Sequence, residues 1–379
     1  MTIKRKQLIV ITSLIFLAMP KVYSSQNNER PRKENEVTIT QELDIKIDDI
    51  EKLLISNNIE LKSYKLRIKQ NKNLLQSSIS LWYPKLNLSS TGIPKYLDGS
   101  NLNQNDSSKD TSSKQLSASL SAELNWDLIK PSRKSEINIA KENLKKAKYS
   151  YLIKLRDLKL KSLKEFYLLQ QSYQDVKVAQ QSVNYSKSNF EEAKIRLKSG
   201  VGTKLEVLEA KTQLSRDIQL LSNKLGTQKI KQRYLARILN LHPKVTASIS
   251  SPPKVKGIWD ISIEESIVNA FSYRKELDNI LADISINNNN AISSLSSTKP
   301  TLTLYNTISQ SLTEGEASVK SPDMNTTYSS LNNTLGIKGT WQLIDGGKAK
   351  ALYKYNKNKA EEEKSKFAMR VLSIRKEVE

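Results

Sequence analysis

An internal duplication constrains the fold of this chain more than any other feature of its sequence. Three groups of residues recur in the same order at an offset of about 216 positions. The matching segments are 47–50 (IDDI) with 263–266 (IEES), 84–88 (PKLNL) with 300–304 (PTLTL), and 126–129 (WDLI) with 341–344 (WQLI). Each copy has the order helix, proline-led strand, polar loop, strand with a tryptophan, and long helix. The sequence therefore predicts two structural repeats built from the same elements.

The later strand of each repeat alternates between apolar and polar residues. A period of two predicts a strand with one apolar and one polar face. Such a strand suits a membrane-spanning sheet, in which the apolar face meets lipid. The residues expected to face lipid are Leu116, Ala118, Leu120, Ala122, Leu124, Trp126, Leu128, Leu335, Ile337, Trp341 and Leu343.

The connections between the strands favour the membrane interpretation. A soluble antiparallel sheet with its apolar face on a core would show the same alternation. However, the segments 91–114 and 310–332 are long and rich in Ser, Asn, Asp and Gly, and long polar loops on one side are typical of outer-membrane strands. Four strands are too few to close a barrel, so we expect a barrel shared between identical subunits.

Between the two strand pairs the sequence predicts a long helical hairpin. From Arg133 to Ser199 there is neither Pro nor Gly, and apolar residues recur in steps of three and four, as in a coiled coil. Gly200 is expected to take the left-handed position that ends the first helix. Thr203 is expected to cap the return helix, with Glu206 completing a capping box.

The N-terminus has the pattern of a cleavable secretory signal. Three basic residues at positions 4–6 precede a twelve-residue apolar stretch from 8 to 19, which is short for a bilayer-spanning helix. No later segment has 18 consecutive apolar residues. The mature protein is therefore expected to begin near Ser25 and to be exported.

Enzymatic interpretations find little support. The sequence contains no Cys and a single His, His242, which excludes thiolate sites and multi-histidine metal sites. A Ser-His-Asp triad would have only His242 as its base, and this residue is not expected to serve one. We expect no catalytic residue, no bound metal and no cofactor. His242 is expected at the end of a helix in a capping or surface role.

The net charge of +22 leaves one alternative of another class open. A secreted basic coiled-coil protein that binds nucleic acid or polysaccharide, without channel activity, would account for the charge and the helical periodicity. It would not account for the duplication or the paired strands. No nucleic-acid partner is therefore expected, and the lysines are interpreted mainly as a solvated surface.

Two motifs resemble those of TolC-like outer-membrane efflux proteins, the outer membrane factors. The stretch 190–210 (FEEAKIRLKSGVGTKLEVLEA) is similar to the helical-tip signature of that family, with Leu197 at a position where an aromatic residue is commoner. The segments 126–128 (WDL) and 341–347 (WQLIDGG) are similar to its strand-to-helix junctions. The resemblance extends from about residue 47 to the end of the sequence.

The resemblance implies a homotrimer in the outer membrane with helices extending into the periplasm. Each protomer would give four strands to a twelve-stranded barrel in contact with outer-membrane lipid, and helices to a periplasmic tunnel. The channel would serve a tripartite efflux or type I secretion system, as a passive duct joined to a periplasmic adaptor protein and an inner-membrane transporter. The tip expected to dock these partners comprises Arg196, Leu197, Gly200, Val201, Gly202, Thr203 and Leu205.

These observations give a mixed, mainly α fold with long coiled-coil hairpins and four transmembrane strands per protomer. The second repeat is expected to be incomplete, because residue 379 corresponds to about position 164 of the first. The second helical tip, which carries the gate residues in the family, would then lie outside this sequence. The predicted divisions are a signal peptide (1–24), a linker (25–46), a first repeat (47–262) with strands 84–90 and 115–128, hairpin 133–241 and linker 242–262, and a second repeat (263–379) with strands 300–309 and 333–344 and the start of a long helix.

Overall fold

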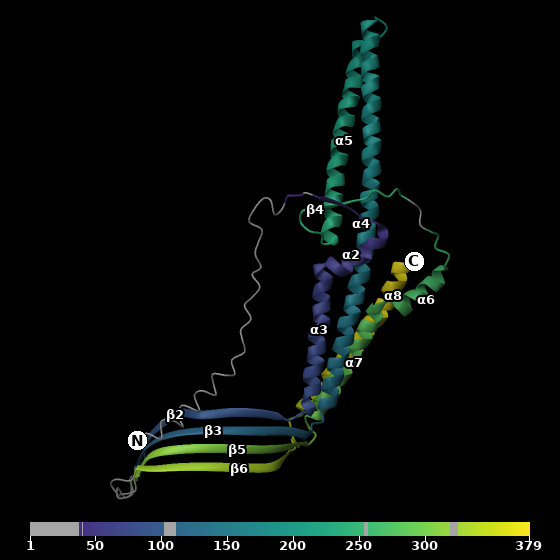
Figure 1. The fold of residues 1–379 in the computed structure, drawn as a ribbon. Helices are drawn as coiled ribbons and strands as arrows, with labels where there is room; N and C mark the ends of the chain where they lie inside the picture. Colours follow the sequence, from purple (N-terminus) through teal and green to yellow (C-terminus); the bar gives the residue numbers. More distant parts are fainter. Residues whose placement is uncertain (1–37, 40, 102–110, 254–256, 319–324) are drawn as a thin grey trace.

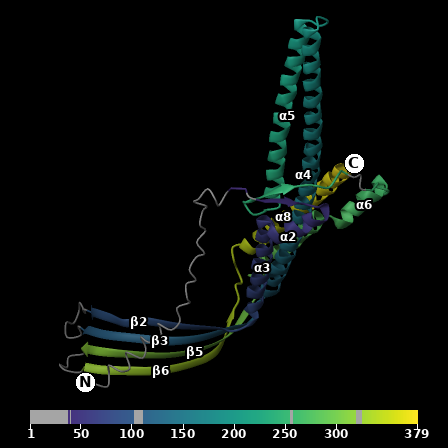
Figure 2. The same ribbon diagram turned by 45° about the horizontal axis from the view of Figure 1, so that its top comes forward.

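The computed structural model describes residues 38–39, 41–101, 111–253, 257–318 and 325–379. The predicted signal peptide lies outside these described residues. A curved four-stranded sheet occupies one end of the molecule, and an elongated group of helices extends from it (Figure 1). A hairpin of α4 (Arg133–Lys198) and α5 (Lys204–Ile238) forms the end remote from the sheet, as the turned view in Figure 2 also shows.

The sheet contains two adjacent strand pairs, one from each repeat. Its strands are β2 (Lys85–Asn101), β3 (Thr111–Ile129), β5 (Thr301–Ser318) and β6 (Asn325–Thr340). They are antiparallel in the order β2-β3-β5-β6, so the two pairs join through β3 and β5. Both outer strands, β2 and β6, leave one edge without a partner strand in the described sheet.

The strands are longer than the sequence predicts, and the prediction of two long polar loops is wrong in extent. The ladder of β2 and β3 continues to Asn101 opposite Thr111, and that of β5 and β6 continues to Glu316 opposite Asn325. Polar side chains indicate that a segment is exposed to water, but they do not prevent it from forming a strand. Strand pairing needs only hydrogen bonds between backbone groups. Ser and Thr residues also pair well across neighbouring strands. The polar segments therefore extend the sheet instead of ending it.

The helices follow the same spatial order as the strands. α3 (Ile59–Ile79) precedes β2, α7 (Lys275–Ser296) precedes β5, and α8 (Lys348–Val378) follows β6. α3 packs on α4, α4 on α7, and α7 on α8. None of the helices in the described parts of the chain is long and apolar enough to cross a bilayer. With 66 residues, α4 is about 100 Å long and passes beyond this layer into the hairpin.

The main hydrophobic core lies about halfway along α4. Phe166 and Leu169 of α4 are fully buried, together with Leu235 of α5 and Leu54 of α2 (Ile50–Asn57). Shorter elements complete the chain; they are η3 (Ile47–Asp49), η4 (Ser80–Trp82) and α6 (Ile263–Tyr273).

A small parallel sheet closes this core. β1 (Gln41–Asp44) pairs with β4 (Val245–Ser248), and Ala247 of β4 is fully buried in the core. Both strands fall within segments that the sequence predicts as linkers, 25–46 and 242–262. Four residues are too few to show a recognisable period, so only the packing of the chain reveals these strands.

A nearly buried glutamate joins three helices. Glu276 of α7 accepts hydrogen bonds from Arg156 of α4 at 2.7 and 3.1 Å, and one from Arg370 of α8 at 3.1 Å. Only 13% of its side chain is exposed. Burial raises the pKa of Glu276, but the hydrogen bonds from Arg156 and Arg370 lower it more, so its pKa lies below the usual range. The ionised carboxylate therefore holds the second repeat against the first more strongly than the neutral acid does.

Replacing Glu276 by glutamine should make unfolding of the helical region easier at neutral pH by about 1–2 kcal/mol, because charged hydrogen bonds are lost. A lowered native pKa stabilises the fold above the pKa of the unfolded state, and this stabilisation is lost as the pH falls through the native value. The difference between the two proteins should therefore shrink below about pH 4. Thermal unfolding followed by circular dichroism at pH 7 and pH 3 measures it.

The matched control is Glu362→Gln. It removes an exposed ion pair between Glu362 and Lys366, which both lie on α8. Exposed pairs contribute little, so this variant should unfold like the unaltered protein at both pH values. Equal unfolding temperatures for Glu276→Gln and the unaltered protein at pH 7 would show that the cluster does not stabilise the helix layer.

Candidate functional site

The first candidate site is one face of the sheet, which is apolar over most of its length. Leu124 of β3 lies opposite Leu86 of β2, and Ala122 lies opposite Leu88 on one side and Ile308 on the other. Side chains of directly opposite residues share a face. The residues of this apolar face are Leu86, Leu88, Leu116, Ala118, Leu120, Ala122, Leu124, Trp126, Ile129, Leu302, Leu304, Ile308, Leu312, Leu331, Leu335 and Ile337.

The apolar face is open in a single protomer. Leu86 and Leu335 are each 71% exposed, and Leu331 is 75% exposed. A patch of this extent is unfavourable in water and indicates a surface that another apolar phase covers. Two polar residues on this face satisfy each other, since the Asn306 amide donates to Asn333 Oδ1 at 2.8 Å.

The opposite face carries hydroxyl, amide and carboxylate groups. The hydroxyls of Ser89 and Ser121 lie 2.7 Å apart across β2 and β3, and those of Ser311 and Ser330 lie 2.7 Å apart across β5 and β6. Near the helices, Thr303 donates to the Asp127 carboxylate at 2.9 Å. This polar face suits contact with water.

The height of the apolar face matches the outer-membrane hydrocarbon layer. On β5 it extends from Leu302 to Leu312, which is about 34 Å along an antiparallel strand. A strand tilted by about 40° covers about 25 Å of membrane height over that length, the usual height of the apolar band in such proteins. Beyond Leu312, Glu314 and Lys114 lie on adjoining strands. Charged residues thus follow the apolar face at the end remote from the helices.

Three residues predicted to face lipid occupy other positions. Trp341 and Leu343 lie beyond the end of β6 at Thr340, because the strand stops before the junction with α8. Leu128 lies in a bulge where Asp127 is opposite Thr303 and Ile129 is opposite Leu302. The bulge shifts the alternation by one residue, so Ile129 continues the apolar face.

The two tryptophans of the predicted junctions have the same structural role in both repeats. The indole N–H of Trp126 donates to the carbonyl of Trp82 at 2.9 Å, and that of Trp341 donates to the carbonyl of Thr298 at 3.0 Å. Each acceptor lies just after the helix that enters the first strand of its repeat. The duplicated tryptophan therefore ties the incoming helix end to the outgoing strand end.

The helices after the strands begin differently in the two repeats. Before α8, the Asp345 carboxylate accepts from the backbone N–H groups of Gly347 at 2.9 Å and Ala349 at 2.7 Å, and both Gly346 and Gly347 have positive φ. At the start of α4, Arg133 is buried, stacks on the Trp82 ring at 4.2 Å and donates to the Asp127 carbonyl. In the first repeat, the stacking of Arg133 on Trp82 thus takes the place of the turn that Gly346 and Gly347 form before α8.

The second candidate site is the tip of the α4–α5 hairpin, where the predicted caps are confirmed. Gly200 has a φ of 79°, the left-handed conformation in which glycine avoids a Cβ clash. The Thr203 hydroxyl accepts from the N–H of Glu206 at 3.2 Å, the first of the two hydrogen bonds of the predicted capping box. The chain thus reverses within the five residues between α4 and α5.

Gly202 is required for a different reason, which the sequence does not reveal. Its N–H and that of Val201 both donate to the Arg196 carbonyl, at 3.0 and 3.1 Å. A Cβ on residue 202 would lie 2.9 Å from Arg196 Cβ and 3.1 Å from the backbone nitrogen of Leu197. A side chain at residue 202 would therefore force the backbone around Arg196 to shift, whereas a Cβ on Gly200 would meet nothing within 4 Å.

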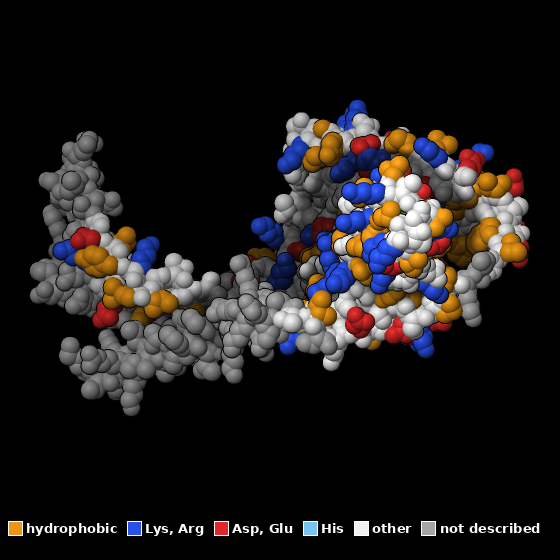
Figure 3. Space-filling view, turned by 90° about the horizontal axis from the view of Figure 1, so that it is seen from above, with side chains coloured by type: hydrophobic (Ala, Val, Ile, Leu, Met, Phe, Trp, Pro, Cys, Tyr) orange, Lys and Arg blue, Asp and Glu red, His pale blue; other side chains and the backbone are white. Residues whose placement is uncertain are grey.

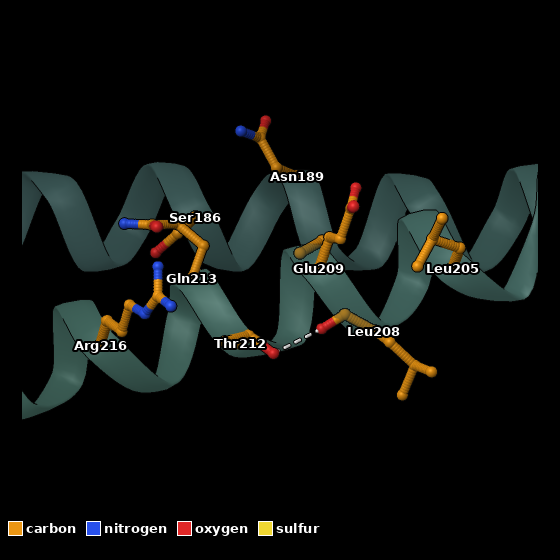
Figure 4. A pocket seen from close by; sticks show the side chains of 9 residues that line it. Ser186, Asn189, Leu205, Leu208, Glu209, Thr212, Gln213 and Arg216 are labelled. Carbon is orange, nitrogen blue, oxygen red and sulfur yellow. Dashed lines mark hydrogen bonds between the residues drawn. The ribbon is translucent and has the colours of Figure 1, made fainter.

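The tip presents apolar side chains to the surroundings. Val201 is 81% exposed and Leu205 is 65% exposed, and Arg196 forms an ion pair with Glu192 at 2.8 Å. A shallow groove of about 610 Å³ lies beside it; its lining includes Ser186, Asn189, Leu205, Leu208, Glu209, Thr212, Gln213 and Arg216 (Figure 4). These groups suit contact with another helix better than a small ligand.

The described residues contain no cluster of three or more His, Cys, Asp or Glu side chains that could hold a metal ion. His242 lies exposed in the turn after α5, where its Nδ1 accepts from the N–H of Lys244 at 3.3 Å. No arrangement for acid–base or nucleophilic chemistry accompanies it among these residues.

Comparisons with known proteins agree with this architecture. The family model for outer membrane efflux proteins matches residues 51–241. Among solved structures, the CmeC outer membrane channel of Campylobacter jejuni is 14% identical with a TM-score of 0.70, covering 93% of this chain and 76% of that one. VceC of Vibrio cholerae is 12% identical with a TM-score of 0.66, covering 86% of this chain and 75% of that one. No curated protein sequence matches.

The family match covers α2 to the end of α5, which includes the first strand pair and the tip. The structural similarity extends the same fold over the second repeat. These findings give no support to the alternative of a secreted coiled-coil protein without channel activity. The chain belongs to the outer membrane efflux protein family, and it is an outer-membrane channel protein whose helices extend into the periplasm.

Proposed function

We propose that three copies of this protein form one passive export duct across the outer membrane and the periplasm. The observation that carries this proposal is a sheet with one apolar face about as tall as the membrane, two free edges, and helices leading away from it. Four strands cannot close a barrel, and the free edges of β2 and β6 can pair between copies. Three copies give twelve strands and leave no open edge.

In this assembly the apolar face of the sheet contacts lipid and the polar face lines the duct. The lipid-facing residues are those predicted on β3, from Leu116 to Trp126, together with Leu335 and Ile337 on β6. Their partners on β2 and β5, such as Leu86 and Ile308, extend this surface. The hydroxyl groups of the polar face keep the interior of the duct hydrated, as an export duct requires.

The tip of the α4–α5 hairpin docks a periplasmic adaptor protein, which connects the duct to an inner-membrane transporter. The docking residues are Arg196, Leu197, Gly200, Val201, Gly202, Thr203 and Leu205. The exposed Val201 and Leu205 support this role, because apolar groups at the end of a hairpin suit packing against a partner helix. Energy for export comes from the transporter, in either a tripartite efflux pump or a type I secretion system.

The sequence contains no cysteine, so a single introduced cysteine can be labelled specifically and used to test this proposal. Val201→Cys carries a single photo-activatable cross-linker, and the protein is expressed with candidate adaptor proteins. We expect trimers on extraction with detergent, conductance in planar bilayers, and an adaptor cross-link from position 201. The same label at Lys62, on α3, is the control and should give no such cross-link.

Monomers without conductance would overturn the duct. Conducting trimers with no adaptor cross-link from position 201 would leave the duct intact but exclude docking at the tip. Transport assays with small drugs and with a secreted protein distinguish efflux from type I secretion.

A further inference from the structure

The helix that enters the first strand pair carries a lysine stripe. Lys62, Lys65, Lys69 and Lys72 of α3 are spaced by three and four residues, so they lie on one side of the helix, and all four are exposed. The single acidic residue of α3, Glu60, points elsewhere and pairs with Lys154 of α4 at 2.6 Å.

A second stripe lies on the adjacent part of α4. Lys134, Lys141, Lys145 and Lys148 are exposed and spaced by seven, four and three residues, which again selects one side. Lys145 pairs with Glu142 of the same helix at 2.7 Å. In the described part of the chain, Lys134, Lys141 and Lys148 form no ion pair.

The two stripes lie on the same side of the helix layer. α3 and α4 contact each other through Glu60 with Lys154, and through Lys65 near the Tyr151 ring. With about 100° of rotation per residue, the middle of each stripe lies roughly 90–120° around its helix from this contact, and Lys65 lies on the contact side of its stripe. Because α3 runs toward the sheet and α4 runs away from it, both rotations lead to the same side. The stripes therefore form one surface, called the lysine face.

The lysine face is unfavourable for the isolated helices. Like charges at spacings of three and four residues repel each other and destabilise a helix. Lys62, Lys69 and Lys72 also form no ion pair with any described residue. Lys134 lies in the first turn of α4, where the helix dipole disfavours a cation. This charge repulsion and the unfavourable position of Lys134 are concentrated on one surface. Their concentration indicates a negatively charged partner outside the chain that compensates for them.

The dimensions of the lysine face indicate a polymeric partner. From Lys134 to Lys148 it extends along α4 for about 21 Å, starting at the sheet. A layer of lipid headgroups lies only at the sheet end, and its field falls off within a Debye length of about 8–10 Å. A small anion would meet two or three lysines at most. An extended polyanion in the periplasm can meet all of them.

We propose that the lysine face binds the peptidoglycan layer, a glycan polymer whose peptide stems carry free carboxylates. The proposal rests on the location of the channel, with its helices in the periplasm, and is independent of docking at the tip. Binding is electrostatic and not shape-specific, since flexible lysines act as point charges. It holds the lysine face against the cell wall next to the outer membrane.

The test is co-sedimentation of the detergent-extracted protein with purified peptidoglycan sacculi. The variant replaces Lys62, Lys69, Lys72, Lys141 and Lys148 by glutamine. Basic side chains also surround the hairpin end seen in Figure 3, so a control of equal charge is needed. The control replaces Lys177, Lys187, Lys198, Lys211 and Lys229 of the hairpin, which are exposed and form no ion pair among the described residues.

Affinity for sacculi should fall at least about tenfold for the lysine-face variant and change little for the control. The loss of binding with added salt should also be shallower for the lysine-face variant, since fewer counterions are exchanged. Circular dichroism and the size of the assembly should be the same for all three proteins.

Equal loss for both variants would overturn the proposal in favour of non-specific charge attraction. Unchanged binding to sacculi, with reduced binding to vesicles of phosphatidylglycerol, would assign the face to lipid instead. Unchanged binding to both, with impaired export of an anionic cargo, would place the lysines inside the duct. Loss of conductance or of trimers in the unaltered protein would refute the proposed duct without bearing on sacculus binding.

Discussion

A lysine introduced at Ile308 should destabilise the membrane-inserted protein by about 2–4 kcal/mol, because it places a charge near the middle of the bilayer. Ile308 lies almost midway between Leu302 and Leu312, the ends of the apolar face on β5. The cost should fall to about 0–1 kcal/mol for Leu312→Lys, whose side chain lies close to the interface. Unfolding by denaturant in lipid vesicles measures both values.

Ser309→Lys is the matched control, since it changes the next residue of the same strand. Ser309 lies opposite Ser121 on the polar face, where water can solvate a new charge. We expect a much smaller change in unfolding free energy and a normal amount of protein in the outer membrane. Similar costs for Ile308→Lys and Ser309→Lys would mean that the apolar face does not contact lipid.

Replacing Gly202 by alanine should reduce transport at least about tenfold without changing the amount or location of the protein. The new Cβ would collide with Arg196, so the loop that carries Val201 must move. A loss of only about 1.4 kcal/mol in docking energy lowers the affinity for the adaptor tenfold. The trimer should persist, because the sheet and the long helices hold it together and the loop contributes little.

Two other glycines separate the possible causes. Gly226→Ala in the middle of α5 meets nothing within 4 Å and should leave transport unchanged, with a gain in stability of about 0.5–1 kcal/mol. Gly200→Val keeps open space around the side chain but must adopt a positive φ, at a cost of roughly 1 kcal/mol or more.

We expect Gly200→Val to impair transport and adaptor cross-linking while leaving assembly intact. Normal transport by both Gly202→Ala and Gly200→Val would show that the shape of the tip does not matter for docking. Loss of trimers in either variant would instead identify the hairpin loop as a folding element.

Local periodicity and local capping made much of this fold predictable from the sequence. The alternation around Leu124 predicts which side chains share a face, because successive residues of any strand point to opposite sides. Gly200 and Thr203 predict where the hairpin turns, because few residues can end or begin a helix. The repeated tryptophans predict two equivalent junctions. Each of these inferences depends on residues that are close together in the chain.

Tertiary structure alone decided the features that depend on distant residues. The length of the strands follows from pairing between β3 and β5, which are about 190 residues apart, and this pairing overrides the polar composition that suggests loops. β1 exists only because β4 lies beside it. Gly202 is needed for the shape of the tip only because Arg196 lies against it, and Glu276 is anionic and nearly buried only because arginines from α4 and α8 reach it. Local sequence encodes the backbone preferences and the faces of each element, whereas packing determines which faces meet.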